Sequence, residues 1–213
     1  MINTGEWLSE AWQIVSGNIV THIILTLIVA FGSSITAGIL AGPLICGYLW
    51  IIFQTMKDPS YEPQIGDVGK GFENWVDTIL VGIVGGIIAG IGSILCGIGV
   101  ILTAPLVIFA FPLVAERRMA FWPAIMESIN KVKQNYGGWI VFALVLGLIN
   151  AAGGMVAIGW LITYPITIVA LALAYRDNYD IEGVAAAGPE SPETPEAPES
   201  YETPEPPSSP TEQ

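Results

Sequence analysis

An uncharged stretch of 38 residues, Thr78–Ala115, is the feature that most constrains how this chain can fold. The turn-forming triplet Gly97-Ile98-Gly99 lies in its middle. A bilayer core is about 30 Å thick, and one helix needs about 20 apolar residues to cross it. The stretch therefore predicts two membrane crossings joined by a tight turn. Composition agrees, because only 12% of the residues are charged, whereas soluble domains average about 25%.

The rest of the chain repeats this helical hairpin, which predicts an all-α polytopic membrane bundle over residues 1–177. We expect six transmembrane helices, arranged as three tandem hairpins, at about 19–36, 39–56, 76–95, 98–115, 137–153 and 156–175. The second helix of each hairpin has a proline near its start (Pro43, Pro105 and Pro165), which marks an internal repeat. Amphipathic segments at 5–17, 68–77 and 121–135 are expected to lie at the membrane interface with their apolar faces toward lipid.

The positions of the basic residues predict the orientation. All seven follow an even-numbered helix: Lys57, Lys70, Arg117, Arg118, Lys131, Lys133 and Arg176. A six-helix arrangement gathers them on one side, which the positive-inside rule makes cytoplasmic. We therefore predict an integral protein of the plasma (inner) membrane with both termini in the cytoplasm. The alternative is a set of shallow hairpins that enter only the inner leaflet. Tryptophans favour the headgroup level, and we expect Trp75, Trp122 and Trp139 at the inner boundary and Trp160 near the outer one.

Glycines and prolines in the predicted helices mark packing sites and kinks. Gly82, Gly86 and Gly90 recur on one face of a helix, and Gly38 and Gly42 share the same spacing. Small residues allow membrane helices to approach closely, so we predict packing within the chain, with a homo-oligomer interface or a Gly-lined pore as alternatives. Proline removes a backbone hydrogen bond, so kinks are expected at Pro43, Pro105, Pro112 and Pro165. Broken helices also occur at transport sites.

The sequence shows no catalytic or metal-binding constellation. No Asp, Glu, Lys or Arg lies deeper than the ends of the predicted spans, although intramembrane charges are the usual markers of proton and ion pathways. His22 is the only histidine, and Cys46 and Cys96 are far apart in apolar runs, so neither pattern makes a metal site. Asn150 is expected to form an interhelical hydrogen bond. We therefore expect no cofactor and no enzymatic activity.

Two surfaces are candidates for contacts with partners. Basic residues beside the amphipathic segments can bind anionic lipid headgroups at about 1 kcal/mol each, and here these are Arg117, Arg118, Lys131 and Lys133. Residues 178–213 form an acidic cytoplasmic tail rich in Pro and Glu, which predicts disorder with polyproline II character. The tail either solvates this end or tethers a cytoplasmic protein through Tyr201. The formal net charge of −12 argues against nucleic acid as a partner.

Two stretches of the sequence resemble segments of known membrane proteins. Residues 42–75 combine a Pro–Gly helix start with a polar loop and the pattern Asp67, Gly71 and Phe72. Residues 111–135 combine a Pro-Leu-Val exit and a charged corner with a helix that carries Ala124, Ser128 and Asn135. The chain thereby resembles uncharacterised bacterial polytopic inner-membrane proteins, and its layout is similar to the membrane domain attached to some glycerophosphodiester phosphodiesterases. The resemblance covers roughly residues 40–177 and implies a multi-helix inner-membrane domain. It implies no phosphodiesterase activity, because the soluble catalytic domain has no counterpart in this sequence.

These features favour a non-enzymatic integral membrane protein that acts as a scaffold or partner-binding subunit. Its partners would be membrane lipids, a second copy of the chain or a cytoplasmic protein. The alternative function is a transporter or channel for a small or lipid-like solute. A water-accessible cavity at mid-membrane would favour transport, whereas a dry, glycine-packed bundle would favour a scaffold.

Overall fold

Every secondary-structure element in the described part of the chain is helical. The computed structural model describes residues 2–58, 60–94, 98–156, 158–179 and 181, and no strand occurs among them. The α-helices are α1 (Thr4–Gly17), α2 (Ile19–Ile35), α3 (Ala41–Lys57), α4 (Trp75–Ile94), α5 (Ile98–Thr103), α6 (Ala110–Arg117), α7 (Phe121–Lys133), α8 (Tyr136–Met155) and α9 (Trp160–Asn178). Two 3₁₀ segments, η1 (Ile65–Phe72) and η2 (Ala104–Val107), complete the list. The predicted all-α class is confirmed.

Three stretches of the described residues are long and apolar enough to cross a membrane: Trp75–Gly92, Gly99–Arg117 and Tyr136–Met155. Helices α1 and α2 meet at 98°, and this bent pair makes a fourth candidate if it counts as one span. Only 17% of Trp75–Gly92 and 22% of Tyr136–Met155 is buried inside the protein. Exposed apolar surface of this extent marks a contact with membrane or protein, and the length of these helices favours a membrane localisation.

The helix boundaries agree with five of the six predicted spans to within a few residues. Helices α2 and α3 are each 17 residues long, which corresponds to about 25 Å at 1.5 Å per residue. A helix of this length is slightly shorter than the hydrocarbon core of a bilayer is thick, which is about 30 Å. The helices thus lie where they were predicted, whereas the number of membrane crossings remains a prediction.

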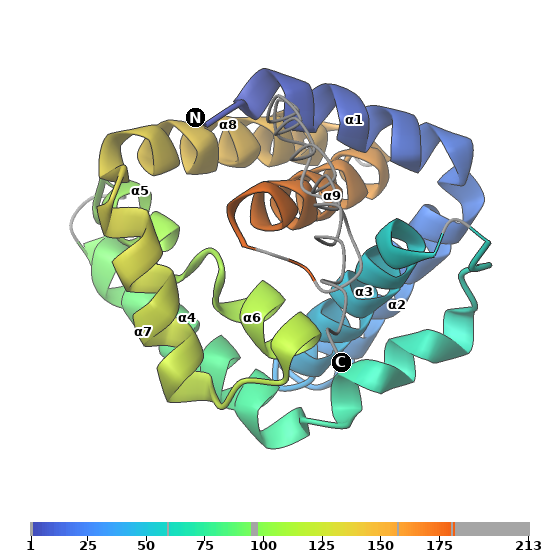
Figure 1. Ribbon diagram of the computed structural model, residues 1–213, viewed down its shortest axis with the longest axis horizontal. Coiled ribbons are helices and arrows are strands. Elements are labelled where there is room, and N and C mark those ends of the chain that lie inside the picture. The colour runs from blue at the N-terminus through green and yellow to red at the C-terminus, as the bar shows by residue number, and fades with distance from the viewer. Residues whose placement is uncertain (1, 59, 95–97, 157, 180, 182–213) are drawn as a thin grey trace, which may run out of the picture.

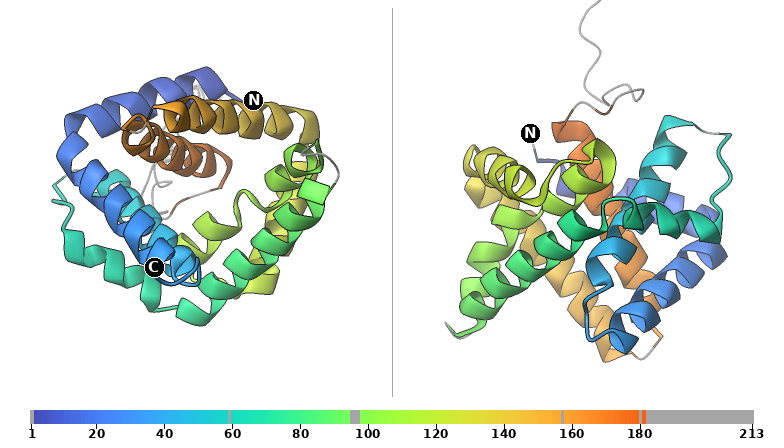
Figure 2. Two further views of the ribbon diagram at one scale, coloured as in Figure 1. Left: turned by 180° about the vertical axis from the view of Figure 1, so that it is seen from behind. Right: turned by 90° about the horizontal axis from the view of Figure 1, so that it is seen from below.

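The three hairpins point in the same direction. In Figure 2 (right), the ends where α2 approaches α3, α4 approaches α5 and α8 approaches α9 all lie on one side of the molecule. Helix α7 and the C-terminal ends of α3 and α9 lie on the opposite side. The last turns of α3, α6, α7 and α9 carry basic residues. We call the side where these last turns lie the basic end.

The predicted fourth span is broken rather than continuous. Helix α5 ends at Thr103, η2 contains Pro105, and α6 begins only at Ala110. Ser128 of α7 supplies partners at the break, because its hydroxyl accepts a hydrogen bond from the Phe109 N–H at 3.1 Å and donates one to the Leu106 carbonyl at 2.8 Å. An unpaired backbone group in lipid costs several kcal/mol. The neighbouring helix thus makes the break tolerable.

The other predicted kink positions differ from one another. Pro43 and Pro112 are the third residues of α3 and α6, where the N–H groups of a helix have no intrahelical acceptor. These two prolines therefore begin a helix and do not kink one, contrary to expectation. Pro165 lies in the interior of α9, which continues through it to Asn178.

Helices α3 and α9 form the centre of the fold. Figure 1 shows α9 inside a ring that includes α1, α2, α4, α7 and α8. Ten residues of α3 and nine of α9 are buried. An aromatic cluster extends this core, with the Phe109 and Trp139 rings 4.8 Å apart and the Phe53 and Tyr175 rings 5.3 Å apart. The ring of outer helices thus separates the core from the membrane.

Helix α1 packs against protein, which corrects the expectation that its apolar face lies on lipid. Trp7, Ala11 and Val15 on that face are at most 1% exposed. The Trp7 ring stacks on Trp139 at 6.0 Å, and its indole N–H donates to the Asp177 carboxylate at 2.7 Å. Trp139 is therefore a core residue and does not face lipid headgroups, whereas its predicted depth at the inner boundary stays a prediction. The Trp7 and Trp139 rings thus pack against aromatic side chains and not against lipid headgroups.

The packed chain continues past the predicted boundary at residue 177. Tyr179 stacks on Tyr175 at 4.6 Å, and Ile181 is only 4% exposed. The rest of the predicted tail, including Tyr201, lies outside the described residues, as does Cys96.

The backbones of α3 and η1 approach each other closely. A Cβ atom added at Gly71 would lie 1.9 Å from the Pro43 carbonyl oxygen, and one added at Gly47 would lie 2.0 Å from the Val68 carbonyl oxygen. Only glycine permits backbones to meet at this distance, which is how membrane helices gain packing contacts. Neither glycine was predicted as a packing residue, because the two lie in separate segments with no common spacing.

We predict that Gly71→Ala lowers the free energy of unfolding by about 1–3 kcal/mol, because the added methyl forces η1 away from α3. Gly69→Ala is the matched control, since Gly69 lies in the same 3₁₀ segment with nothing within 4 Å of an added Cβ. The measurement is reversible unfolding in mixed detergent micelles, followed by tryptophan fluorescence. Equal stability of the two variants would contradict the close α3–η1 contact.

Candidate functional site

Glu116 connects the ends of three helices at the basic end. Its carboxylate, in the last turn of α6, accepts hydrogen bonds from Lys57 at 3.1 Å and from the Tyr175 hydroxyl at 3.3 Å. Lys57 ends α3, and Tyr175 lies near the end of α9. The Glu116 side chain is only 6% exposed. A partly desolvated carboxylate that accepts hydrogen bonds from a charged group contributes more than an exposed ion pair.

Further ion pairs attach η1 and α7 to the same corner. Arg117 lies 3.5 Å from Glu127 of α7, and Arg118 forms an ion pair with Glu73. Lys70 of η1 also reaches Glu73, at 3.0 Å. Hydrogen bonds from Lys70 and Arg118 lower the pKa of the Glu73 carboxyl below its ordinary value. These exposed pairs are screened by water and contribute little to stability, so their main effect is to fix positions.

A bidentate ion pair attaches α1 to α9. The Arg176 guanidinium contacts the two Glu10 oxygens at 2.6 and 3.0 Å, and its Nε lies 2.9 Å from Asp177. Paired N–H···O bonds of this kind are among the strongest charged contacts in proteins. Helix α1 is therefore held at the basic end by charge as well as by its buried tryptophan.

Three of the four residues predicted to bind anionic lipid already have protein partners. Arg117 and Lys131 lie over the Tyr179 ring at 5.5 and 5.2 Å, and Arg118 is paired with Glu73. Lys133 is exposed. Arg117, Lys131 and Asn178 are among the residues that line an open depression of about 310 Å³. Lipid contact at these four positions remains a prediction, and the carboxylates beside Arg117 and Arg118 compete with any anionic headgroup.

The predicted packing glycines fall into two groups. A Cβ atom at Gly42 would lie 2.2 Å from the Thr78 carbonyl oxygen, and Gly82 lies across the same α3–α4 contact. Gly38 has φ +87° in the turn before α3 and no close neighbour. Gly86 and Gly90 are exposed, and within the described chain nothing lies within 4 Å of an added Cβ. A homo-oligomer contact at these last two positions remains a prediction.

The isolated polar residues of the predicted spans have local partners. His22 Nδ1 lies 2.7 Å from the Tyr48 hydroxyl, and the Asn150 amide donates to the Thr167 hydroxyl at 3.0 Å, which joins α8 to α9 as expected. Cys46 is buried with a free thiol. Among the described residues, no group of three or more His, Cys, Asp or Glu side chains is arranged to hold a metal.

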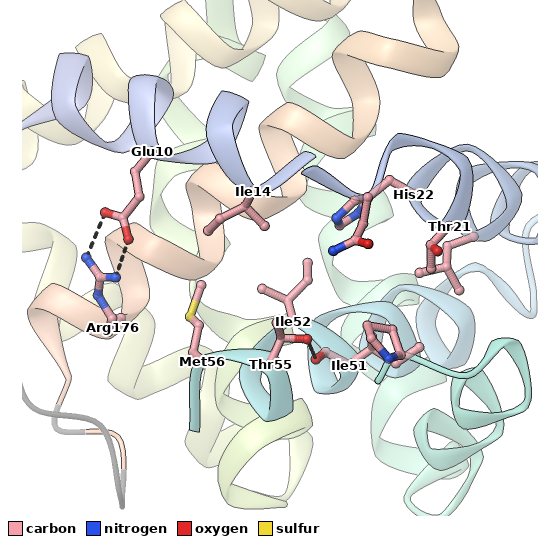
Figure 3. A pocket seen from close by; sticks show the side chains of 12 residues that line it. Glu10, Ile14, Thr21, His22, Ile51, Ile52, Thr55, Met56 and Arg176 are labelled. Carbon is pink, nitrogen blue, oxygen red and sulfur yellow. Dashed lines mark hydrogen bonds and ion pairs between the residues drawn. The ribbon is translucent and has the colours of Figure 1, made fainter. Parts of the chain in front are cut away.

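A pocket of about 290 Å³ lies between α1, α2 and the C-terminal half of α3 (Figure 3). Glu10 and Arg176 lie at one of its ends, and His22 and Thr21 lie at the other. This site was not predicted from the sequence, because its walls come from segments far apart in the chain. The only local signal was the opposite charge of Glu10 and Arg176, and spacing in the sequence could not pair them.

Comparisons with protein-family models, curated proteins and solved structures found no match to this chain.

We predict that Glu116→Gln lowers the free energy of unfolding by about 2 kcal/mol, because Lys57 would lose its carboxylate partner in a partly desolvated contact. Glu73→Gln is the control, since the exposed Glu73 side chain also accepts two basic partners. We expect a clearly smaller loss for the control in the same micelle unfolding assay. A loss at Glu116 no larger than that at Glu73 would show that the three helix ends do not depend on this carboxylate.

Proposed function

We propose that this protein is a non-enzymatic integral membrane protein that acts as a scaffold or partner-binding subunit of the plasma (inner) membrane. The observation that carries the proposal is the construction of the basic end. Ion pairs attach α1, η1 and α7 to the ends of α3, α6 and α9. The result is a surface of fixed shape next to the membrane, which is what a scaffold requires.

The proposed topology has six crossings, with both termini and the basic end in the cytoplasm. The common direction of the three hairpins supports it, because the basic residues then lie on the side that the positive-inside rule assigns to the cytoplasm. The exposed apolar faces of α4 and α8 would contact lipid. They include Ile83, Ile87, Val141 and Leu148, each at least half exposed.

The broken span supports a scaffold over a transporter. In transporters, unwound segments of broken helices offer free backbone carbonyls to ions and substrates. Here the Leu106 carbonyl accepts the Ser128 hydroxyl, and the Leu102 carbonyl accepts the Tyr136 hydroxyl. Both acceptors are thus used by α7 and α8, and the break serves to route the chain.

An exposed apolar face on α4 and α7 is the proposed contact surface for a partner. Trp75 and Trp122 are each 57% exposed, and Met126 is 40% exposed. The Asp77 carboxylate accepts the Phe121 N–H at 2.9 Å, which joins the first turns of the two helices. Trp75 and Trp122 therefore lie at neighbouring helix starts near the membrane surface, where aromatic side chains are common contact residues.

Accessibility labelling tests the proposed topology. In a chain whose Cys46 and Cys96 are replaced by Ala, single cysteines are placed at Ser34 and Met155 near the hairpin tips and at Lys133 at the basic end. We expect a membrane-impermeant maleimide to label the first two in intact cells and the third only after permeabilisation. Protection of Ser34→Cys and Met155→Cys in intact cells would instead favour shallow hairpins.

Photo-crosslinking tests the scaffold function. A benzophenone amino acid at Met126 is compared with one at Val141, which is 55% exposed on α8 and faces the proposed lipid. We expect one discrete protein adduct from position 126 in native membranes and only lipid adducts from position 141. Lipid adducts alone from both positions would contradict a partner contact on α7.

A transporter or channel for a lipid-like solute is the second candidate function. The pocket between α1, α2 and α3 favours it, because that pocket combines polar ends with apolar walls. In the proposed topology the pocket would lie toward the basic end rather than at mid-membrane, which is why we place this function second.

A further inference from the structure

The pocket between α1, α2 and α3 has the chemistry of an amphiphile site. Ile14, Ile52 and Met56 lie between its two polar ends (Figure 3). Its volume of about 290 Å³ is at the lower limit for ligand pockets, which span about 300–1,000 Å³. A pocket of this size holds a polar head and the first part of an apolar tail. The remainder of the tail would lie outside the pocket.

The charged end of the pocket favours a cation. Two carboxylates, Glu10 and Asp177, flank the single guanidinium of Arg176, whose Nε and two terminal nitrogens all contact them. The Arg176 side chain is only 11% exposed, whereas that of Glu10 is 39% exposed. A ligand therefore meets the Glu10 carboxylate more readily than the guanidinium. An ammonium group suits this end, and a purely anionic head would meet an excess of negative charge.

The opposite end of the pocket offers neutral polar groups. Thr21 and His22 lie at this end, and Asn18 also lines the pocket. His22 Nδ1 lies 2.7 Å from the Tyr48 hydroxyl, which leaves Nε2. Amide, hydroxyl and imidazole N–H groups donate hydrogen bonds to phosphate oxygens. The pocket thus combines a carboxylate for an ammonium, neutral donors for a phosphate and apolar side chains for a tail.

We infer that this pocket binds the headgroup of an aminophospholipid of the phosphatidylethanolamine type. The ammonium group contacts Glu10, and the phosphate lies toward Asn18, Thr21 and His22. The level of the pocket agrees, because it lies where the charged end of the molecule meets the apolar helices. This level coincides with the lipid headgroups if the proposed membrane placement holds. The site does not depend on whether the protein acts as a scaffold or a transporter.

The first test ranks lipids on the unaltered full chain in detergent, with bound lipid measured by native mass spectrometry. Phosphatidylethanolamine, phosphatidylcholine and phosphatidylglycerol with identical acyl chains are offered at equal concentration. We expect phosphatidylethanolamine to bind about tenfold more tightly than phosphatidylglycerol, with phosphatidylcholine between them, because its quaternary ammonium has no N–H to donate. Equal or tighter binding of phosphatidylglycerol would overturn the inference.

The second test places the lipid in the pocket. Glu10→Gln removes the carboxylate, and we expect it to weaken phosphatidylethanolamine binding about tenfold. Glu6→Gln is the matched control, because Glu6 is also on α1 and does not line the pocket. Met56→Trp fills the pocket and is expected to abolish the bound lipid. Unchanged binding in Glu10→Gln relative to Glu6→Gln would overturn the assignment.

A soluble competitor separates the two sources of the same headgroup. Phosphoethanolamine at the concentration of the lipid is expected to leave the lipid bound, because it lacks the tail that contacts Ile14 and Ile52. Displacement would identify the free, soluble headgroup as the ligand and overturn the lipid assignment. Binding is measured in detergent and is independent of the labelling pattern in cells. Failure of this inference is therefore distinguishable from failure of the proposed topology.

Discussion

The carboxylate of Glu116 is the contact on which the arrangement of the helices depends. It lies where α3, α6 and α9 end, and it accepts hydrogen bonds from Lys57 and Tyr175. Helices α3 and α9 are the centre of the fold, so joining their ends to α6 fixes the broken span relative to the core. The surrounding pairs, Arg117 with Glu127 and Arg176 with Glu10, then place α7 and α1. Charge thus organises one end of a molecule whose helices are otherwise apolar.

Lipid as a solvent explains why the remaining contacts are so close. Lipid tails are as apolar as leucine, so burying apolar side chains between helices gains little free energy there. Packing must come from short backbone distances, as at Gly71 against Pro43 and Gly42 against Thr78. Backbone groups must also be satisfied inside the protein, and the hydroxyl of Ser128 meets this requirement at the break after η2. The same requirements leave α4 and α8 free to expose their outer faces.

The helices were predictable because uncharged runs and their polar borders are local features of the sequence. Residues 137–153 and α8 agree closely, and so do residues 19–36 and α2. The fourth span shows the limit of this reasoning. The three prolines that mark the internal repeat have equivalent positions in the sequence. Pro43 nevertheless begins a helix, Pro105 lies in a break and Pro165 lies inside a helix. Whether a proline breaks a helix depends on which neighbour supplies partners for the freed backbone groups, and only Pro105 has Ser128 of α7 nearby.

The sequence alone determined that the chain is all-helical, where its helices lie and that its charges gather at their ends, because each of these follows from local apolarity and chain length. Only the tertiary structure decided that Trp7 and Trp139 are core residues, since their partners lie more than a hundred residues apart in the chain. It also decided that Gly47 and Gly71 lie at a close backbone contact and that Glu10, His22 and Arg176 share one pocket. Such contacts depend on how distant helices meet, which no local pattern of residues records.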